Sequence, residues 1–134
     1  MNVKIITTKG DLVFDQIDSY LKEAGIVCSE FSRNDARNVF QDSIPQIVLL
    51  DMTGPIARPS FVKEIIDQSK DGRLVGVLGV ISKRDIGNVD YQLGLDDFLL
   101  SPIDYDELLT RLNMLSDKYS TVGESSNMIK VEDL

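Results

Sequence analysis

Apolar and polar residues follow two alternating patterns along the first 118 positions of the chain. Short apolar runs predict strands at residues 3–8, 26–30, 47–51, 74–81 and 97–100. The segments between them place apolar residues three or four positions apart, which is typical of helices that pack on one side. Because strand and helix alternate in this way, we expect a parallel sheet joined by right-handed crossovers. The fold class is α/β: a flavodoxin-like, doubly wound, five-stranded parallel sheet of strand order 2-1-3-4-5, with helices on both faces.

The third apolar run is the most clearly marked strand. Residues 47–50 are consecutive apolar residues that follow Pro45 and lead into Asp51. A run without alternation is typical of a strand buried on both faces, as in the centre of a parallel sheet. The sequence therefore predicts a central strand with Asp51 at its carboxyl end.

The first and last helices carry clear end signals. Asp11 is expected to cap the first helix and Gly25 to end it. Asp104 and Glu107 form a capping box at the last helix, and the leucines that follow supply its packing face. Both helices should therefore be regular and well packed.

Two crossovers are less well marked. Ser32 or Asn34 is expected to cap a short second helix. The crossover at 84–93 is the poorest, because Gly87 and Asn88 lower helix stability by about 1 kcal/mol or more relative to alanine. We expect this segment to be short or irregular.

The composition changes after Lys118. Residues 119–127 are rich in serine, with Thr121 and Gly123, and show no core pattern, which predicts a linker. Residues 128–134 alternate apolar and polar side chains like the opening strand of a further domain. The expected organisation is a domain at 1–118, a linker at 119–127 and the start of a second domain at 128–134.

The composition removes several classes of chemistry. The chain has no His and no Trp and one Cys, so Ser–His and Cys–His catalysis, His/Cys zinc sites and disulfide frameworks are excluded. The sequence motifs of dinucleotide and P-loop sites are also absent. With 14 basic and 22 acidic residues the net charge is −8, so this segment is not expected to wrap a nucleic-acid backbone itself. We expect a protein that is not an enzyme.

The expected cellular location of the protein follows from similar features of the sequence. The N-terminus lacks a basic segment followed by a long apolar run, and no apolar run approaches the ~20 residues of a membrane span. Cys28 follows Ile26 and Val27 and is interpreted as a small buried hydrophobe in a reducing compartment. A cytoplasmic protein without a membrane partner is expected.

Polar residues cluster where ligands of this fold class bind. In an open α/β sheet, that place is outside the carboxyl ends of the strands. The residues expected there are Thr8, Lys9, Gly10, Asp11, Asp51, Ser82, Ser101 and Pro102.

Two segments resemble the receiver domains of response regulators. Residues 47–52, Ile-Val-Leu-Leu-Asp-Met, look like the third receiver strand, and the resemblance puts Asp51 at the phosphoacceptor position. Residues 94–112 are similar to the "GADDYLxKPF…ELLxRL" signature of the OmpR/PhoB family, with Phe98 at the switch aromatic. Residues 128–134 resemble the opening strand of the winged-helix DNA-binding domain that follows such receivers.

The resemblance implies a CheY-like fold and a regulatory role in two-component signal transduction. DNA would be bound by a domain expected after Leu134, and a histidine kinase is a possible partner. In the family, charged residues of the fourth helix, fifth strand and fifth helix form a two-fold dimer interface. The residues at or near those positions are Arg84, Asp96, Asp97, Glu107 and Arg111. We therefore expect a homodimer through this face.

The departures from the family pattern concern the phosphorylation site. Receivers carry an acidic pair after the first strand that binds Mg²⁺ together with the phosphoacceptor; here Thr8 and Lys9, or Lys9 and Gly10, stand there. A Lys ammonium repels the dication. In the family, a lysine precedes a proline and the peptide bond between them is typically cis; Ser101 stands in the place of that lysine here. The family's hydroxyl-bearing residue at the end of the fourth strand aligns with Gly79 or with Ser82. We hypothesise an atypical, pseudo-receiver pocket without a cofactor, in which Lys9 takes the metal's place and pairs with Asp51.

Three alternatives remain open. Asp51 could be phosphorylated by a histidine kinase, with Mg²⁺ held by Asp11 and a further carboxylate. The chain could be a flavodoxin-like small enzyme or flavin carrier, although the loops after strands one and three lack a phosphate cradle. It could also be a protein-binding adaptor with no DNA partner.

Overall fold

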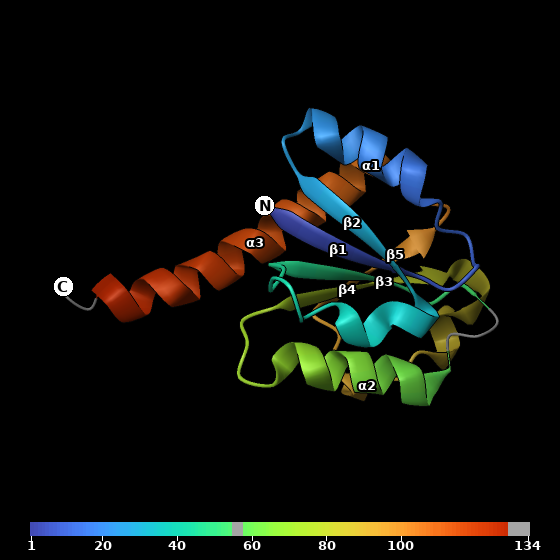
Figure 1. Cartoon of the computed structure of the whole chain (residues 1–134). Helices are drawn as coiled ribbons and strands as arrows, with labels where there is room; N and C mark the ends of the chain where they lie inside the picture. Colours follow the sequence, from blue (N-terminus) through green and yellow to red (C-terminus); the bar gives the residue numbers. More distant parts are fainter. Residues whose placement is uncertain (55–57, 129–134) are drawn as a thin grey trace.

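The computed structural model describes residues 1–54 and 58–128 as a five-stranded sheet covered by helices (Figure 1). In chain order, the elements are β1 (Asn2–Thr7), α1 (Phe14–Glu23), β2 (Val27–Ser32), η1 (Arg33–Asn38), β3 (Ile47–Asp51), α2 (Pro59–Lys70), β4 (Gly76–Ser82), η2 (Lys83–Asn88), η3 (Tyr91–Leu93), β5 (Asp97–Ser101) and α3 (Tyr105–Met128). The elements labelled η are 3₁₀ helices.

The sheet is parallel throughout, with strand order β2-β1-β3-β4-β5. Every residue of β3 and of β4 is buried, because these strands have a strand on each side and helices over both faces. The expected fold class and strand order are confirmed. The order reverses between β1 and β3, so the carboxyl ends of these two strands flank the place where such sheets bind ligands.

Helices lie over both faces of the sheet (Figure 1), and an apolar layer packs against each face. On one face, α1 and α3 pack against β1, β3, β4 and β5, chiefly through Ile17, Leu21, Leu108 and Leu112. On the other face, η1 and α2 pack against side chains of the opposite strand positions, as the two-residue period of a strand requires.

Two crossovers are 3₁₀ segments instead of α-helices. The crossover around residues 32–40 forms η1, which Lys4 holds from beneath: its buried ammonium donates to the carbonyls of Val39 and Ser43 at 2.6 Å. The crossover after β4 consists of η2 and η3, which confirms the prediction of an irregular segment around Gly87 and Asn88. Few apolar side chains are available there to bury a helix against the sheet.

The start of α1 differs from the prediction. Gly25 has a φ of +78° just after the helix, as expected, but the N-cap residue is Val13 and no side chain caps the helix. Asp11 lies before this point and is engaged elsewhere. The cap predicted at Asp11 is therefore wrong, because contacts with other loops compete for its carboxylate and backbone.

The last helix continues past the expected end of the domain. Asp104 caps it through hydrogen bonds from the backbone N–H groups of Asp106 and Glu107, and the helix then runs to Met128. Residues 119–127, expected to be an irregular linker, are helical, and this end of α3 extends beyond the sheet (Figure 1). The strand expected at 128–134 lies outside the described residues except for Met128, which is helical. The division into domain, linker and second domain stays a prediction.

In the part of the chain that the structure describes, we find no helix long and apolar enough to cross a membrane.

Candidate functional site

Asp51 ends the central strand β3 and is completely buried, with an exposed fraction of 0%. It lies at the carboxyl edge of the sheet, next to the point where strand order reverses. A buried carboxylate requires hydrogen-bond donors around it, because burial of an unpartnered charge is costly. The structure supplies those donors from two loops.

Four hydrogen bonds surround the Asp51 carboxylate. Oδ2 accepts from the backbone N–H groups of Thr8 and Gly10, each at 3.2 Å. Oδ1 accepts from the backbone N–H of Thr53 at 2.9 Å and from its hydroxyl at 2.5 Å. All four donors are neutral. Each carboxylate oxygen therefore already has two donors from the protein itself.

The loop after β1 reaches Asp51 with its backbone. Lys9 adopts a positive φ of 60°, which turns the chain so that the N–H groups before and after it point to the same oxygen. The Lys9 side chain is exposed, and it forms no ion pair with Asp51. The predicted Lys9–Asp51 pair is wrong, because backbone donors satisfy the carboxylate in place of the ammonium.

Two glycines let the loops close over the aspartate. A Cβ on Gly54 would lie 2.2 Å from the carbonyl oxygen of Thr8, and a Cβ on Gly10 would lie 2.1 Å from the hydroxyl oxygen of Thr53. Only residues without side chains allow this approach. The loop after β1 and the loop after β3 are therefore in backbone contact directly above Asp51.

Asp11 connects this edge to β5. Its carboxylate accepts a 2.6 Å hydrogen bond from the hydroxyl of Ser101, and its backbone N–H donates to the Thr53 hydroxyl oxygen at 2.6 Å. The Ser101–Pro102 peptide bond is cis, as the resemblance implied. Ser82 and Ser101 are paired at the ends of β4 and β5, and both are buried. The structure thus gathers most of the predicted edge residues, with Lys9 turned outward.

These residues do not fit a magnesium ion. A hard dication takes several oxygen ligands, usually carboxylates. Of the titratable residues that the structure describes, no three His, Cys, Asp or Glu side chains form a group that could hold a metal. Asp51 is saturated by N–H and O–H donors, which a cation cannot replace without opening both loops. The Asp11 carboxylate is bonded to Ser101.

Thr53 is the residue that the sequence interpretation missed. It donates to Asp51 twice and accepts from Asp11, so it bridges the two carboxyl-bearing residues of the site. Hydroxyl side chains two positions after an aspartate often form such local turns, and this spacing was the available signal.

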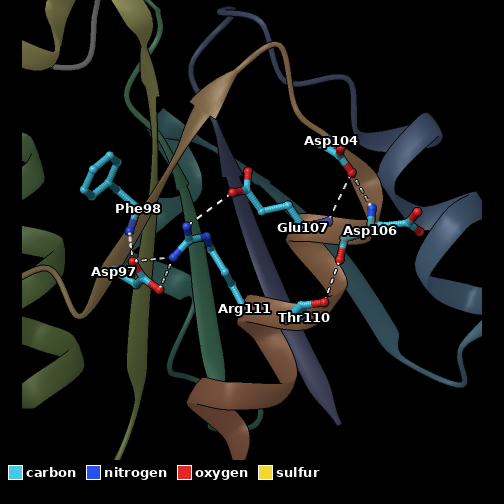
Figure 2. A network of polar contacts seen from close by, with 7 residues as sticks. All are labelled: Asp97, Phe98, Asp104, Asp106, Glu107, Thr110 and Arg111. Carbon is cyan, nitrogen blue, oxygen red and sulfur yellow. Dashed lines mark hydrogen bonds and ion pairs between the residues drawn. The ribbon is translucent and has the colours of Figure 1, made fainter.

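A second polar cluster lies on β5 and α3 (Figure 2). The guanidinium of Arg111 bonds both carboxylate oxygens of Asp97, at 3.0 and 2.9 Å, and Glu107 at 3.2 Å. The hydrogen bond with Asp97 is the main cause of the raised pKa of Arg111, with Glu107 adding to it against the opposing effect of burial. Three of the five predicted interface residues are therefore paired with one another within one chain.

The other predicted interface residues behave differently. Arg84 lies on η2 with an exposed side chain and reaches only Asp85, at 3.9 Å. Asp96 is turned toward α2 and α3, where it contacts Lys70 and Tyr119, so it does not belong to the Arg111 cluster. Phe98, at the switch aromatic position, projects from β5 away from Arg111 and is 40% exposed (Figure 2). It is not a core residue.

Comparison with known proteins gives matches by structure alone, since no family model and no curated protein sequence matches the chain. One similar structure is NtrX from Brucella abortus in complex with ADP, with a TM-score of 0.76 and 19% identity over 95% of this chain. This chain covers 28% of NtrX, so it spans little more than a quarter of that protein.

Isolated receiver domains match over nearly their whole length. The receiver domain of the Francisella response regulator 1452 has a TM-score of 0.71 and 21% identity, covering 87% of this chain and 97% of that one. A CheY-like receiver domain protein from Methanospirillum hungatei has a TM-score of 0.72 and 13% identity, covering 90% and 96%. With its strand order and its aspartate at the end of β3, the chain has the fold of CheY-like response-regulator receiver domains.

Proposed function

We propose that this chain is the regulatory, receiver-like part of a DNA-binding transcriptional response regulator of the OmpR/PhoB type, and that it works without Mg²⁺-dependent phosphorylation of Asp51. The observation that carries the proposal is the closed site: Asp51 is fully buried and both of its carboxylate oxygens are saturated by hydrogen bonds. Fold likeness alone would not decide between a phosphorylated and an unphosphorylated module.

The chemistry of phosphoryl transfer explains why closure matters. A carboxylate that attacks phosphorus needs a free lone pair in line with the leaving group and a cation that stabilises the transferred oxygens. Here the backbone N–H of Gly10 and both donors of Thr53 already bond the carboxylate oxygens, and Ser101 stands where the family has a lysine. The arrangement favours a fixed conformation of the loops over one that a phosphoryl group resets.

The direct test is chemical modification of the folded chain. We expect no change in intact mass after incubation with Mg²⁺ and acetyl phosphate, and no ¹⁹F signal of a bound beryllofluoride. A receiver domain that has the acidic pair serves as the positive control in the same buffers. Stoichiometric labelling that disappears in Asp51→Ala would instead support the alternative in which Asp51 is a phosphoacceptor and a histidine kinase is the partner.

We also propose that the chain forms a homodimer through the face made by η2, β5 and α3. Two apolar side chains, Phe98 and Met114, are 40% and 64% exposed, and Met114 follows Glu107 and Arg111 on one side of α3 at helical spacing. Exposed apolar groups rimmed by charges are typical of interaction surfaces. The Arg111 cluster would pre-order this face within each protomer.

Sedimentation at several concentrations tests the dimer. Phe98→Ser should weaken self-association by at least tenfold, whereas Leu74→Ser, which changes an exposed leucine just before β4, should not. Equal effects of the two substitutions, or a monomer at all concentrations, would contradict the proposed face.

DNA binding is proposed for the sequence that follows Leu134. The described part of the chain is acidic overall, so its own surface is poorly suited to a phosphate backbone. A longer chain that extends past Leu134 should bind duplex DNA with strong salt dependence, and residues 1–134 alone should not. If the longer chain also fails to bind DNA, the adaptor alternative is favoured.

A further inference from the structure

Two arginines line a small cavity on the face of the sheet opposite α1 and α3. Arg33 and Arg37 project from η1, and the cavity of about 230 Å³ lies between this turn and α2. Glu64 is the single carboxylate in its lining. The site is separate from Asp51 and from the Arg111 cluster.

The Arg33 side chain is held in place by the protein before any ligand binds. Its guanidinium lies over the ring of Phe61, 5.1 Å from the centroid, and Phe61 is a buried residue of α2 in the core layer on this face of the sheet. Stacking of this kind holds the plane of the guanidinium with little loss of its hydrogen-bonding capacity. Its buried Nε has no hydrogen-bond partner within the part of the chain described.

The turn that carries both arginines is itself fixed. Ala36 and Val39 are buried, and the Lys4 ammonium holds the carbonyls of Val39 and Ser43. Asp35, the acidic residue between the arginines, accepts a hydrogen bond from the Ser32 hydroxyl at 2.9 Å and does not line the cavity. A rigid turn that places two arginines in the lining of one cavity can bind an oxyanion at low entropic cost.

The arginines lack anionic partners from the protein. Neither Arg33 nor Arg37 forms an ion pair with a carboxylate of the described residues, although the chain carries eight more acidic than basic groups. Both guanidinium groups therefore belong to the lining of the cavity without forming an ion pair there, although Glu64 lies in the same lining.

We propose that the cavity between η1 and α2 is a binding site for a small phosphorylated molecule, with Arg33 and Arg37 holding its phosphoryl oxygens. Two guanidiniums match the two charges of a phosphate monoester, and each can donate to it in bidentate fashion. The amides of Asn34 and Gln68 are available to the neighbouring oxygens. The volume lies below the ~300–1,000 Å³ usual for drug-sized ligands, so the bound molecule is small.

Pyrophosphate is the probe for the test, with amide chemical shifts of the full chain as the readout. Shifts should concentrate in η1 and α2. Arg37→Ala, which changes an exposed side chain, should weaken binding at least about tenfold. Arg33→Lys, which keeps the charge but removes the planar fork, should also weaken it.

Glu64→Gln is the most informative substitution, because it removes the negative charge of the one carboxylate in the cavity lining. It should strengthen pyrophosphate binding about threefold or more. Lys63→Ala is the matched control: this neighbouring lysine pairs with Asp67 and does not line the cavity, so affinity should change less than twofold. Equal weakening by Lys63→Ala and Arg37→Ala, or tighter binding of citrate than of pyrophosphate, would overturn the proposal. So would the absence of localised shifts.

Discussion

The hydroxyl of Tyr119 donates a 2.6 Å hydrogen bond to Asp96 and accepts one of 2.7 Å from Lys70, which is also paired with Asp96. The three residues come from α3, from the segment before β5 and from the end of α2. The Tyr119 ring also lies against Gly76, where a side chain would crowd it. This cluster holds α3 at the edge of the sheet where the helix begins to extend beyond the body of the fold.

Tyr119→Phe should lower the free energy of unfolding by about 1–2 kcal/mol, because Lys70 and Asp96 each lose a hydrogen bond in a partly buried site. Urea denaturation measures the change. Tyr105→Phe is the matched control, since the Tyr105 hydroxyl donates to Gln16 at an exposed position. Equal losses for the two variants would argue against a special role of the Tyr119 cluster.

The same cluster leads us to expect that the free energy of unfolding decreases in acid. Burial by itself would raise the pKa of Asp96, but hydrogen bonds from Lys70, Tyr119 and the Val77 N–H outweigh it and hold the pKa below its ordinary value of 3.8. The stabilisation is therefore complete above pH 3.8 and is lost as the pH falls through the lower pKa of the folded state. The free energy of unfolding of Asp96→Asn should depend less on pH in this range, as measured by denaturation at a series of pH values. A dependence as steep as that of the parent chain would contradict the assignment.

Asp51→Asn should destabilise the fold by about 1–3 kcal/mol. All four groups that face the carboxylate are donors, so an amide nitrogen at this position leaves at least one of them unsatisfied. Asp67→Asn, at an exposed ion pair, should cost no more than about 0.5 kcal/mol. In a cluster of repelling carboxylates, neutralisation would stabilise the protein, and that result would refute the closed site described above.

Lys9→Gly should stabilise the chain by about 0.5–1 kcal/mol, because Lys9 has a φ of 60° that side chains rarely adopt. Lys9→Ala keeps this conformational cost and should leave stability nearly unchanged. Thermal unfolding compares the two variants. Destabilisation by both would mean that the ammonium contributes to the site after all.

Gly54→Ala should cost about 1–3 kcal/mol, since its Cβ would meet the Thr8 carbonyl oxygen at 2.2 Å. Gly87→Ala, in η2, has open space around the added Cβ and should be neutral or stabilising. Parallel urea curves of the two variants give the comparison. Tolerance of Gly54→Ala would show that the loops above Asp51 separate easily.

Cys28 should react slowly in the folded protein. Burial, with a smaller contribution from Asp18, raises the pKa of its thiol from 9.0 to about 11, which lowers the thiolate fraction at neutral pH about 100-fold. Labelling with a thiol-reactive chromogen should be fast only in denaturant. Since the unfolded thiol ionises first, the free energy of unfolding should also fall as the pH rises above 9.0.

Local sequence signals predicted the parts of the fold that depend on near neighbours. The apolar runs gave all five strands, Gly25 and Asp104 marked two helix ends, and Gly87 with Asn88 indicated an irregular crossover. Helix α3 was predicted too short because serine-rich composition favours a linker, whereas the structure continues the helix beyond the Tyr119 cluster. Asp96 was likewise assigned to the dimer interface on an outer face, because nothing in the sequence around it indicates that it pairs with Lys70.

By itself, the sequence determined the five strands, the α/β class that follows from their alternation with helices, and the place of Asp51 at the end of the central strand, because burial patterns and turn residues act over a few positions. The tertiary structure alone decided what surrounds Asp51. Two loops that are more than forty residues apart in sequence meet there, and their contact sets the backbone angle of Lys9 and turns its ammonium outward. Such contacts depend on how whole strands are placed next to each other, which no local pattern of side chains records.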